Sequence, residues 1–413
     1  MNAGAARCDI TPPKGVRLSG FAGRDWRNDG VRDPVEATAL WMETDGRAVV
    51  VLSLDIIGVT VAEDARFRAA IGDRLGIDAD NVLIACTHNH AGPATMGIRA
   101  TGGKETGWTR TIRERCIEAA VSARHRAEPV ASIRVGSAPC AAAVNRRHAE
   151  GPSETKVRVL MLCGESPIAS LFHTAMHPVC RGNQDRLVSA DWVGVARNGF
   201  ENETGAPALA LQGCCGDINP RVRDAEAIGR EVARSLSAAV HESETVTPEW
   251  NHCSAQGAVP LGALPSEAEI VHRETEAERT LDQPSIGLAA RQLARADLDW
   301  AKHCRGLRDR GKEGPTTARF RTMALRIGPV VLAGLPGEVF QEIGQRMIER
   351  DPQVWPVGFA AGNLGYLYPD SALDLGGYEV DLAYRLYGER QAERGTASAL
   401  QAVVATTIAG LPR

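Results

Sequence analysis

The sequence predicts an α/β fold in which mixed β-sheets are flanked by helices. Short apolar runs, which are typical of buried strands, recur between residues 37 and 361. Stretches with apolar residues at helical spacing separate some of these runs, and turn residues join others into hairpins. No linker rich in proline, glycine and serine interrupts the chain. We therefore expect a single domain over residues 1–413.

The composition excludes several classes of protein. Hydrophobic residues make up 44% of the 413 residues and charged residues 24%, as in an ordinary soluble globular protein. The net charge of −4 argues against a nucleic-acid partner. There is no run of 18 apolar residues, so we expect no membrane insertion. The first residues lack the basic and apolar regions of a secretory signal, which predicts a cytoplasmic protein.

In the first half of the chain, two hairpins frame the expected elements. Residues 37–42 and 48–55 are β-like and are joined through Asp45-Gly46, a strong hairpin signal. The second hairpin pairs residues 157–162 with 168–173. Between the two hairpins we expect, in order, a helix over 61–76, a strand over 82–85, a helix over 105–127 and strands within 131–145.

The second half continues the alternation. Ser189-Ala190-Asp191-Trp192 is a capping signal that predicts a helix as far as about Glu203. The segment Leu335-Pro336-Gly337-Glu338 is expected to open a helix that ends at Arg350. The remaining expected elements are strands at 208–212, 323–327, 330–333 and 355–361, a helix over 223–241, and a largely helical segment over 386–409.

Residues 264–314 differ in character from the rest of the chain. Glutamate, arginine, alanine and leucine dominate there, and the pattern predicts two helices broken at Asp282-Gln283-Pro284. Such a charged helical hairpin is typical of a solvated face or a subunit contact, so a homo-oligomer formed through 264–314 is one expectation. A lid over a functional site is the alternative.

The loop Thr87–Pro93 is the first candidate site. It follows the apolar run of residues 82–85, and His88 and His90 lie at positions i and i+2. In an extended chain these side chains point to the same side. Two imidazoles at a strand end suit a metal, or one metal ligand beside an acid–base group. A turn with two exposed histidines is the alternative, because H-x-H is common by chance.

Other polar groups follow apolar runs in the same way. Two or three histidines with one carboxylate form the ligand set of catalytic zinc, and imidazole favours zinc over magnesium or calcium. Each residue also has a simpler explanation, such as Glu338 serving as a carboxylate at a helix N-terminus. The groups that we expect to converge are His88 and His90, His177, Asp217 and Asn219, Glu338, and Tyr366.

Several short motifs, in order, resemble the catalytic domain of the neutral ceramidase family. The resemblance runs from about residue 3 to about residue 380. The motifs are Asp9-Ile10-Thr11-Pro12-Pro13, Thr87–Pro93, Asn145-Arg146-Arg147, His177-Pro178 with Ser189-Ala190-Asp191, Gln212-Gly213 with Gly216-Asp217-Ile218-Asn219-Pro220, Pro336-Gly337-Glu338, and Gly365-Tyr366 with Tyr378-Glu379.

The resemblance implies a role for each residue. That family holds one zinc ion with two histidines, a glutamate and a tyrosine, which correspond here to His88, His177, Glu338 and Tyr366. His90 corresponds to an active-site residue that does not bind the metal, and is the expected proton carrier. Arg146 and Tyr378 correspond to residues near the substrate carbonyl, where they would stabilise an oxyanion. Asp217 and Asn219 complete the expected catalytic group.

Three departures from the family narrow the expected function. The family often has a serine, discussed as a nucleophile, where this chain has Asn219, so a metal-activated water is the expected nucleophile. We expect no immunoglobulin-like domain, and the 264–314 segment has no counterpart in the family, which disfavours ceramide itself. The prediction is a zinc-dependent amidohydrolase acting on a small molecule. The alternatives are an ester, lactone or glycosidic bond, a non-catalytic zinc-stabilised binding protein, or a hydrolase using Cys214 or Cys215.

Overall fold

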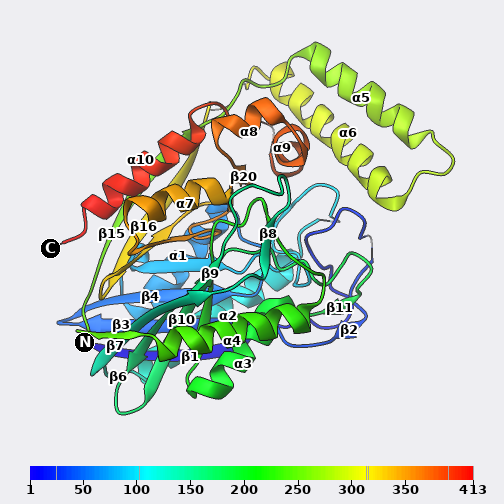
Figure 1. Ribbon diagram of the computed structural model, residues 1–413. Helices are drawn as coiled ribbons and strands as arrows, with labels where there is room; N and C mark the ends of the chain where they lie inside the picture. Colours follow the sequence, from blue (N-terminus) through cyan, green and yellow to red (C-terminus); the bar gives the residue numbers. More distant parts are fainter. Residues whose placement is uncertain (25, 102, 313, 315, 389, 413) are drawn as a thin grey trace.

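Three mixed β-sheets form the centre of the molecule (Figure 1). The computed structural model describes residues 1–412 apart from 25, 102, 313, 315 and 389. The sheet orders are β5-β4-β3-β1-β6, β12-β10-β9-β7-β14 and β15-β16-β17-β19. Each sheet contains one parallel pair, namely β4 with β5, β10 with β12, and β17 with β19. The predicted α/β class with mixed sheets is therefore confirmed.

The strands of the first sheet are β1 (Asn2–Asp9), β3 (Glu36–Thr44), β4 (Arg47–Leu54), β5 (Val82–Cys86) and β6 (Glu128–Pro129). Those of the second are β7 (Ser132–Pro139), β9 (Lys156–Cys163), β10 (Pro167–Thr174), β12 (Ala208–Gln212) and β14 (Glu244–Val246). Those of the third are β15 (Trp250–Pro260), β16 (Thr317–Ile327), β17 (Val330–Gly334) and β19 (Val354–Val357). Short pairs are formed by β2 (Gly30–Val31) with β11 (Leu187–Val188), β8 (Ala143–Asn145) with β13 (Ile218–Pro220), and β18 (Glu338–Val339) with β20 (Tyr366–Leu367).

Central strands such as β4, β10 and β17 read as continuous apolar runs because both of their faces are buried. In β4, Val50 and Leu52 belong to a cluster that includes side chains of helices α1 and α2. The alternate residues Val49 and Val51 belong to a second cluster, which contains residues of all three sheets. The inner faces of the three sheets thus share one apolar core, while their outer faces are covered by helices.

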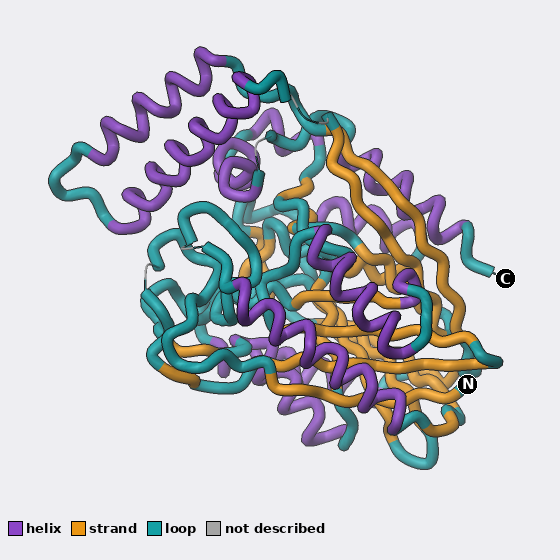
Figure 2. The backbone as a smooth tube through the Cα atoms, turned by 180° about the vertical axis from the view of Figure 1, so that it is seen from behind, coloured by secondary structure: helices purple, strands orange, loops and turns teal. Residues whose placement is uncertain are grey.

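The covering helices lie on the outside of the sheets (Figures 1 and 2). Helices α1 and α2 cover the first sheet, α3 and α4 the second, and α7 and α10 the third. Their bounds are α1 (Val61–Leu75), α2 (Thr106–His125), α3 (Asp191–Thr204), α4 (Ala225–His241), α7 (Gln341–Arg350) and α10 (Thr396–Ala409). Two short helices, α8 (Asp370–Leu375) and α9 (Ala383–Tyr387), and the π-helix η2 (Tyr378–Leu382) lie between α7 and α10 in sequence. A 3₁₀ turn, η1 (Ala79–Asn81), precedes β5.

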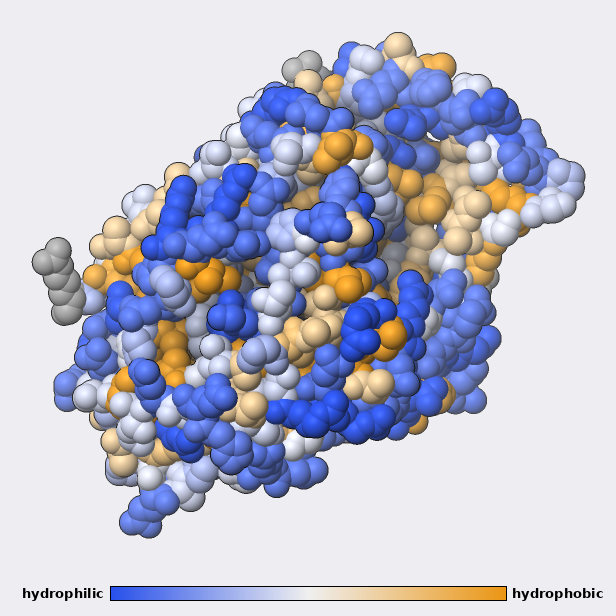
Figure 3. Space-filling view, in the orientation of Figure 1, coloured by the Kyte–Doolittle hydropathy of each residue, from blue (hydrophilic) through white to orange (hydrophobic). Residues whose placement is uncertain are grey.

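The predicted charged hairpin projects from one end of the molecule (Figure 1). It consists of α5 (Glu267–Leu281) and α6 (Leu288–Asp309), with the break where the sequence predicted it. Asp297 of α6 accepts a hydrogen bond from Arg385 of α9 at 2.6 Å. Ala296 of α6 packs with Met96 and Leu386 in an apolar cluster. Apolar residues gather on the side of the hairpin that faces the body (Figure 3).

Some boundaries differ from the sequence expectations. Helix α3 begins at Asp191 and its N-cap is Ala190, which has no capping side chain; the hydroxyl of Ser189 donates to Asp33 at 2.6 Å and accepts from the backbone N–H of Asp191 at 3.0 Å. Glu338 does not open a helix; it lies in β18, which pairs with β20, and α7 begins at Gln341. The strands β1 and β15 were not predicted, and the helical segment expected over 386–409 is interrupted between α9 and α10.

Among the described residues, no helix is both long enough and apolar enough to cross a lipid bilayer.

Candidate metal centre

Three histidines converge where strands of two sheets end. His88 and His90 follow β5, and His177 follows β10. Nitrogen atoms of the three rings all lie within 4.8 Å of one another. The ring centroids of His88 and His177 are 4.9 Å apart, and those of His88 and His90 are 4.7 Å apart. The structure therefore brings together all three histidines that the sequence placed at the site.

Backbone carbonyls orient two of the imidazoles. Nδ1 of His88 lies 2.7 Å from the carbonyl oxygen of Ile57, and Nδ1 of His177 lies 3.1 Å from that of Ile218. A carbonyl can only accept, so each Nδ1 carries a proton, and in the neutral form of each ring the lone pair that can bind a metal lies on Nε2. Both Nε2 atoms face Glu338. Burial lowers the pKa of His177 to about 4, which keeps that ring neutral and able to bind a metal.

Glu338 lies between the two imidazoles and is 0% exposed. Its Oε2 is 3.3 Å from Nε2 of His88 and 3.4 Å from Nε2 of His177. Burial alone would raise the pKa of this carboxyl group, but His88 and His177 outweigh burial, and the pKa lies well below its usual value. Among the described residues, no lysine or arginine forms an ion pair with Glu338.

Tyr387 also contacts Glu338. The hydroxyl of Tyr387 donates a hydrogen bond to Oε1 of Glu338, so both carboxylate oxygens face partners. The sequence analysis did not find Tyr387, because it lies at the end of the short helix α9 with no motif around it. Only the structure shows that Tyr387 lies close to the predicted ligand Tyr366, with their ring centroids 6.2 Å apart.

Gln212, at the end of β12, links the two histidine loops. Its Nε2 donates to the carbonyl oxygens of Thr87 at 3.0 Å and Met176 at 2.9 Å. Its Oε1 accepts from the backbone N–H of Met176 at 3.0 Å. Thr87 and Met176 directly precede His88 and His177, so one buried amide fixes the spacing of the two loops.

His90 is held by packing rather than by hydrogen bonds to its ring. Its Nδ1 and Nε2 are buried and have no partner among the described residues. A Cβ on Gly20 would lie 2.3 Å from Nδ1 of His90, so only glycine fits there. Arg24 donates to the carbonyl oxygen of His90 at 2.7 Å. Burial and the neighbouring imidazoles hold the pKa of His90 well below its usual value, so the ring is neutral.

Arg146 joins the predicted tyrosines to this group. Its Nη2 donates to the hydroxyl of Tyr366 at 3.0 Å, and its Nε donates to Glu379 at 2.9 Å. The ring of Tyr378 packs edge-on against that of Tyr366, with centroids 6.0 Å apart, and Tyr378 is 47% exposed. Arg146, Tyr366 and Tyr378 therefore form a continuous polar wall that extends from Glu338 to the surface.

Asp217 and Asn219 lie on the pair formed by β8 and β13. Oδ1 of Asp217 accepts from the backbone N–H of Gln341 at 2.8 Å, and Oδ2 accepts from Asn145 at 2.7 Å. Both oxygens thus tie the start of α7 to β8. Oδ1 of Asn219 is buried and has no partner among the described residues, so it can still accept a hydrogen bond.

The two adjacent cysteines do not resemble a nucleophile. Cys214 is 2% exposed and Cys215 is 0% exposed. Burial raises the pKa of both thiols well above the usual value, which disfavours the reactive thiolate.

The residues present suit a divalent metal ion. Three imidazoles carry buried nitrogen lone pairs, and Nε2 of His88 and both ring nitrogens of His90 lack a hydrogen-bond donor among the described residues. A buried carboxylate without a cationic side-chain partner is costly unless another cation compensates its charge. Imidazole nitrogens with one carboxylate are a typical ligand set for zinc.

Solved structures of ceramidases superpose on nearly the whole chain. A neutral ceramidase from Pseudomonas aeruginosa matches with a TM-score of 0.75 at 18% identity, over 99% of this chain and 74% of that chain. The chain has a neutral-ceramidase-like fold. A structure described as a ceramidase complexed with C2 gives the same TM-score of 0.75 and identity of 18%, over 99% of this chain and 75% of that chain. No protein-family model matches the sequence, and no curated protein sequence matches it either.

The ceramidase-like fold confirms what the ordered motifs implied about architecture. The separate assignments of His88, His177, Glu338 and Tyr366 as ligands, and of His90 as a proton carrier, stay predictions. Their proximity in the fold makes each of them testable.

Proposed function

We propose that this chain is a zinc-dependent hydrolase that cleaves an amide bond in a small molecule. The observation that carries the proposal is the convergence of His88, His90, His177 and Glu338 beside the Arg146–Tyr366 pair. The ceramidase-like fold supports it, because the residues of the sequence motifs meet at one place in that fold.

We propose that His88, His177, Glu338 and Tyr366 hold the ion. The fixed tautomers of His88 and His177 and the buried Glu338 carboxylate support this choice over a purely structural cluster. When bound, zinc would supply Lewis acidity toward a carbonyl and a water-derived nucleophile near neutral pH. Tyr387, which bonds to Glu338, would then fix the orientation of a ligand.

The remaining polar groups fit amide cleavage. Arg146 is cationic and already donates to Tyr366, so it can also stabilise negative charge that develops on a carbonyl oxygen. Tyr378 is the exposed donor on the same wall. An amide needs a proton on its leaving nitrogen, and the unprotonated ring nitrogen of neutral His90, which has no partner among the described residues, can accept a proton from water and pass it on.

Water is the proposed nucleophile because no described side chain near the site is a suitable nucleophile. Asn219 stands where the related motif has a serine and cannot attack, although its free Oδ1 can position substrate or water. Cys214 and Cys215 are buried with raised pKa values.

We also propose that residues 1–413 act as one catalytic domain and that the α5–α6 hairpin serves as a lid. A hydrogen bond joins α6 to α9, and α9 ends in Tyr387.

The test combines metal analysis with a substrate panel. The purified protein is expected to bind one zinc ion per chain and to hydrolyse N-acyl amines at neutral pH faster than matched esters, lactones or glycosides. The His88→Ala variant is expected to lose both zinc and turnover. Bound zinc with no turnover on any member of the panel would contradict the enzyme assignment and favour a zinc-stabilised binding protein. Faster hydrolysis of an ester, lactone or glycoside would change the proposed bond type and leave the hydrolase assignment in place.

A further inference from the structure

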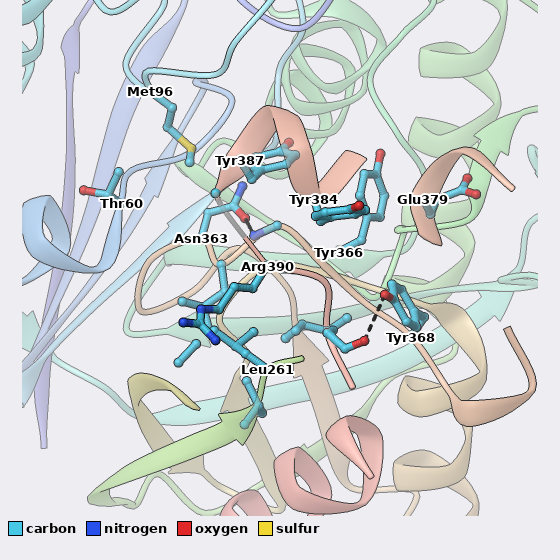
Figure 4. A pocket seen from close by; sticks show the side chains of 17 residues that line it. Thr60, Met96, Leu261, Asn363, Tyr366, Tyr368, Glu379, Tyr384, Tyr387 and Arg390 are labelled. Carbon is cyan, nitrogen blue, oxygen red and sulfur yellow. Dashed lines mark hydrogen bonds between the residues drawn. The ribbon is translucent and has the colours of Figure 1, made fainter. Parts of the chain in front are cut away.

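A cavity of about 240 Å³ adjoins the candidate metal centre (Figure 4). Tyr366 and Tyr387, whose hydroxyls reach Arg146 and Glu338, form part of its wall. The function proposed above assigns it no role. An atom the size of a water molecule occupies about 30 Å³, so the cavity has room for about eight such atoms.

Much of the wall is apolar and suits a hydrocarbon chain. Val259 and Leu261 come from the end of β15 and the residue that follows it, and Leu364 and Leu367 from the segment around β20. A neutral chain of a few methylene groups would be stabilised there because its apolar surface is removed from water.

An unsatisfied donor lies at the inner end of the cavity. Asn363 is 6% exposed, and its Oδ1 accepts from the backbone N–H of Gly365 at 2.7 Å. Its Nδ2 has no hydrogen-bond partner among the described residues. A Cβ on Gly58 would lie 3.2 Å from this Nδ2, and Gly58 follows Ile57, whose carbonyl orients His88. The free N–H group therefore lies on the side of the metal centre.

A second unsatisfied donor is cationic. Nη1 of Arg390 donates to the carbonyl oxygen of Gly262 at 2.9 Å, but Nη2 is buried without a partner in the part of the chain that the structure describes. Arg390 forms no ion pair with any carboxylate in the described part of the chain. In Figure 4, Arg390 lies near Leu261, while Asn363 lies nearer Tyr387 and Met96. The lining of the cavity thus combines a neutral donor, apolar side chains and a cation that has no carboxylate partner among the described residues.

We propose that this cavity binds the acyl part of the amide substrate and that Arg390 pairs with a carboxylate at the far end of that part. Asn363 donates to the substrate at the end next to the amide. The substrate class is then a monoamide of a short dicarboxylic acid, because a guanidinium group pairs well with a carboxylate. Glu379 also lines the cavity, but its charge is taken up by Arg146 and Arg147. This inference rests on the proposed function and names its substrate.

The experiment compares p-nitroanilides of hexanoic acid and adipic acid, which differ by one terminal carboxylate. The protein is expected to show the higher kcat/KM with the adipic compound. Arg390→Gln is expected to lower kcat/KM for the adipic compound roughly tenfold to hundredfold, as for the loss of a charge-assisted hydrogen bond, and to leave the hexanoic compound within about twofold. Arg394→Gln is the matched control, since Arg394 pairs with Asp374 outside the cavity.

A second variant tests the cavity itself. The larger side chain in Leu261→Trp would fill the cavity. We expect this variant to lower kcat/KM for the adipic and hexanoic compounds and to leave kcat/KM for the p-nitroanilide of acetic acid unchanged. Turnover of the hexanoic compound with no preference for the adipic one, or long-chain turnover unchanged in Leu261→Trp, would overturn the subsite and leave the proposed function standing.

Direct binding separates the two proposals. If none of the anilides is hydrolysed, calorimetric titration of the adipic mono-p-nitroanilide into the zinc-loaded protein still reports on the cavity. Binding that is lost in Arg390→Gln and kept in Arg394→Gln supports the subsite without the amidase activity. Absence of binding to the parent protein overturns the subsite.

Discussion

The hydroxyl of Tyr387 donates a hydrogen bond to Oε1 of Glu338, the carboxylate oxygen that does not face the two imidazoles. A partner in this position fixes the carboxylate plane without occupying the atom that faces His88 and His177. It also connects the centre to α9 and, through Arg385 and Asp297, to the α5–α6 hairpin. The α5–α6 hairpin and Glu338 are thereby linked through α9.

Removing that hydroxyl is expected to loosen the metal. Tyr387→Phe should weaken zinc binding about tenfold, within the range seen when a partner of a metal ligand is lost. Competition with a chelator would measure the affinity. Tyr368→Phe is the control, because Tyr368 bonds to the carbonyl oxygen of Ala392 and not to Glu338. Equal zinc affinity in parent and Tyr387→Phe proteins would argue that Glu338 needs no such support.

His88 and His90 are expected to differ when each is replaced by alanine. His88→Ala should lose zinc, because the Nδ1 bond to Ile57 aims Nε2 at the metal centre. His90→Ala should retain zinc and lose turnover, because the predicted role of His90 is proton transfer. Zinc content by elemental analysis and kcat on the same preparations would decide. Loss of zinc from both variants would make His90 a third imidazole ligand, which its nitrogen positions also permit.

Gln212 is expected to matter for both stability and metal binding. Gln212→Leu leaves the carbonyls of Thr87 and Met176 and one N–H group unpaired in the interior. The free energy of unfolding should fall by about 3 kcal/mol, since each buried group left unsatisfied costs about 1 to 3 kcal/mol. Urea denaturation of the metal-free protein would measure this. Gln345→Leu on the exposed side of α7 should change little, and a similar loss there would show that the effect is not specific to the histidine loops.

Arg146 is expected to act on the rate more than on binding. Arg146→Lys keeps the charge but cannot bond Tyr366 and Glu379 at once in the same geometry. We expect kcat to fall about a hundredfold, as for the loss of one oxyanion donor, with KM changed much less. Arg147→Lys is the matched control, because Arg147 shares Glu379 but bonds to the carbonyl oxygen of Gly376. An unchanged kcat in Arg146→Lys would exclude Arg146 from the reaction.

The sequence could predict the strand ends but not the groups that support them. His88, His177 and Glu338 follow recognisable apolar runs or short motifs, and the structure brings them together. The strand that holds Glu338 has two residues and exists only because it pairs with β20, a contact that no local pattern encodes. Tyr387 and the side chain of Gln212 act through partners far along the chain. Ser189, just before α3, likewise bonds to the distant Asp33.

Most of the residues that line the cavity lie late in the sequence, and this has a practical consequence. Apart from Thr60 and Met96, every lining residue lies at or after position 259, whereas the three histidines lie before position 178. The segments that would determine which acyl group binds are therefore separate in sequence from the loops that contain the three histidines. Substitution of cavity residues such as Leu261 and Arg390 should allow substrate preference to be redesigned while the histidine loops and Tyr366 are left intact.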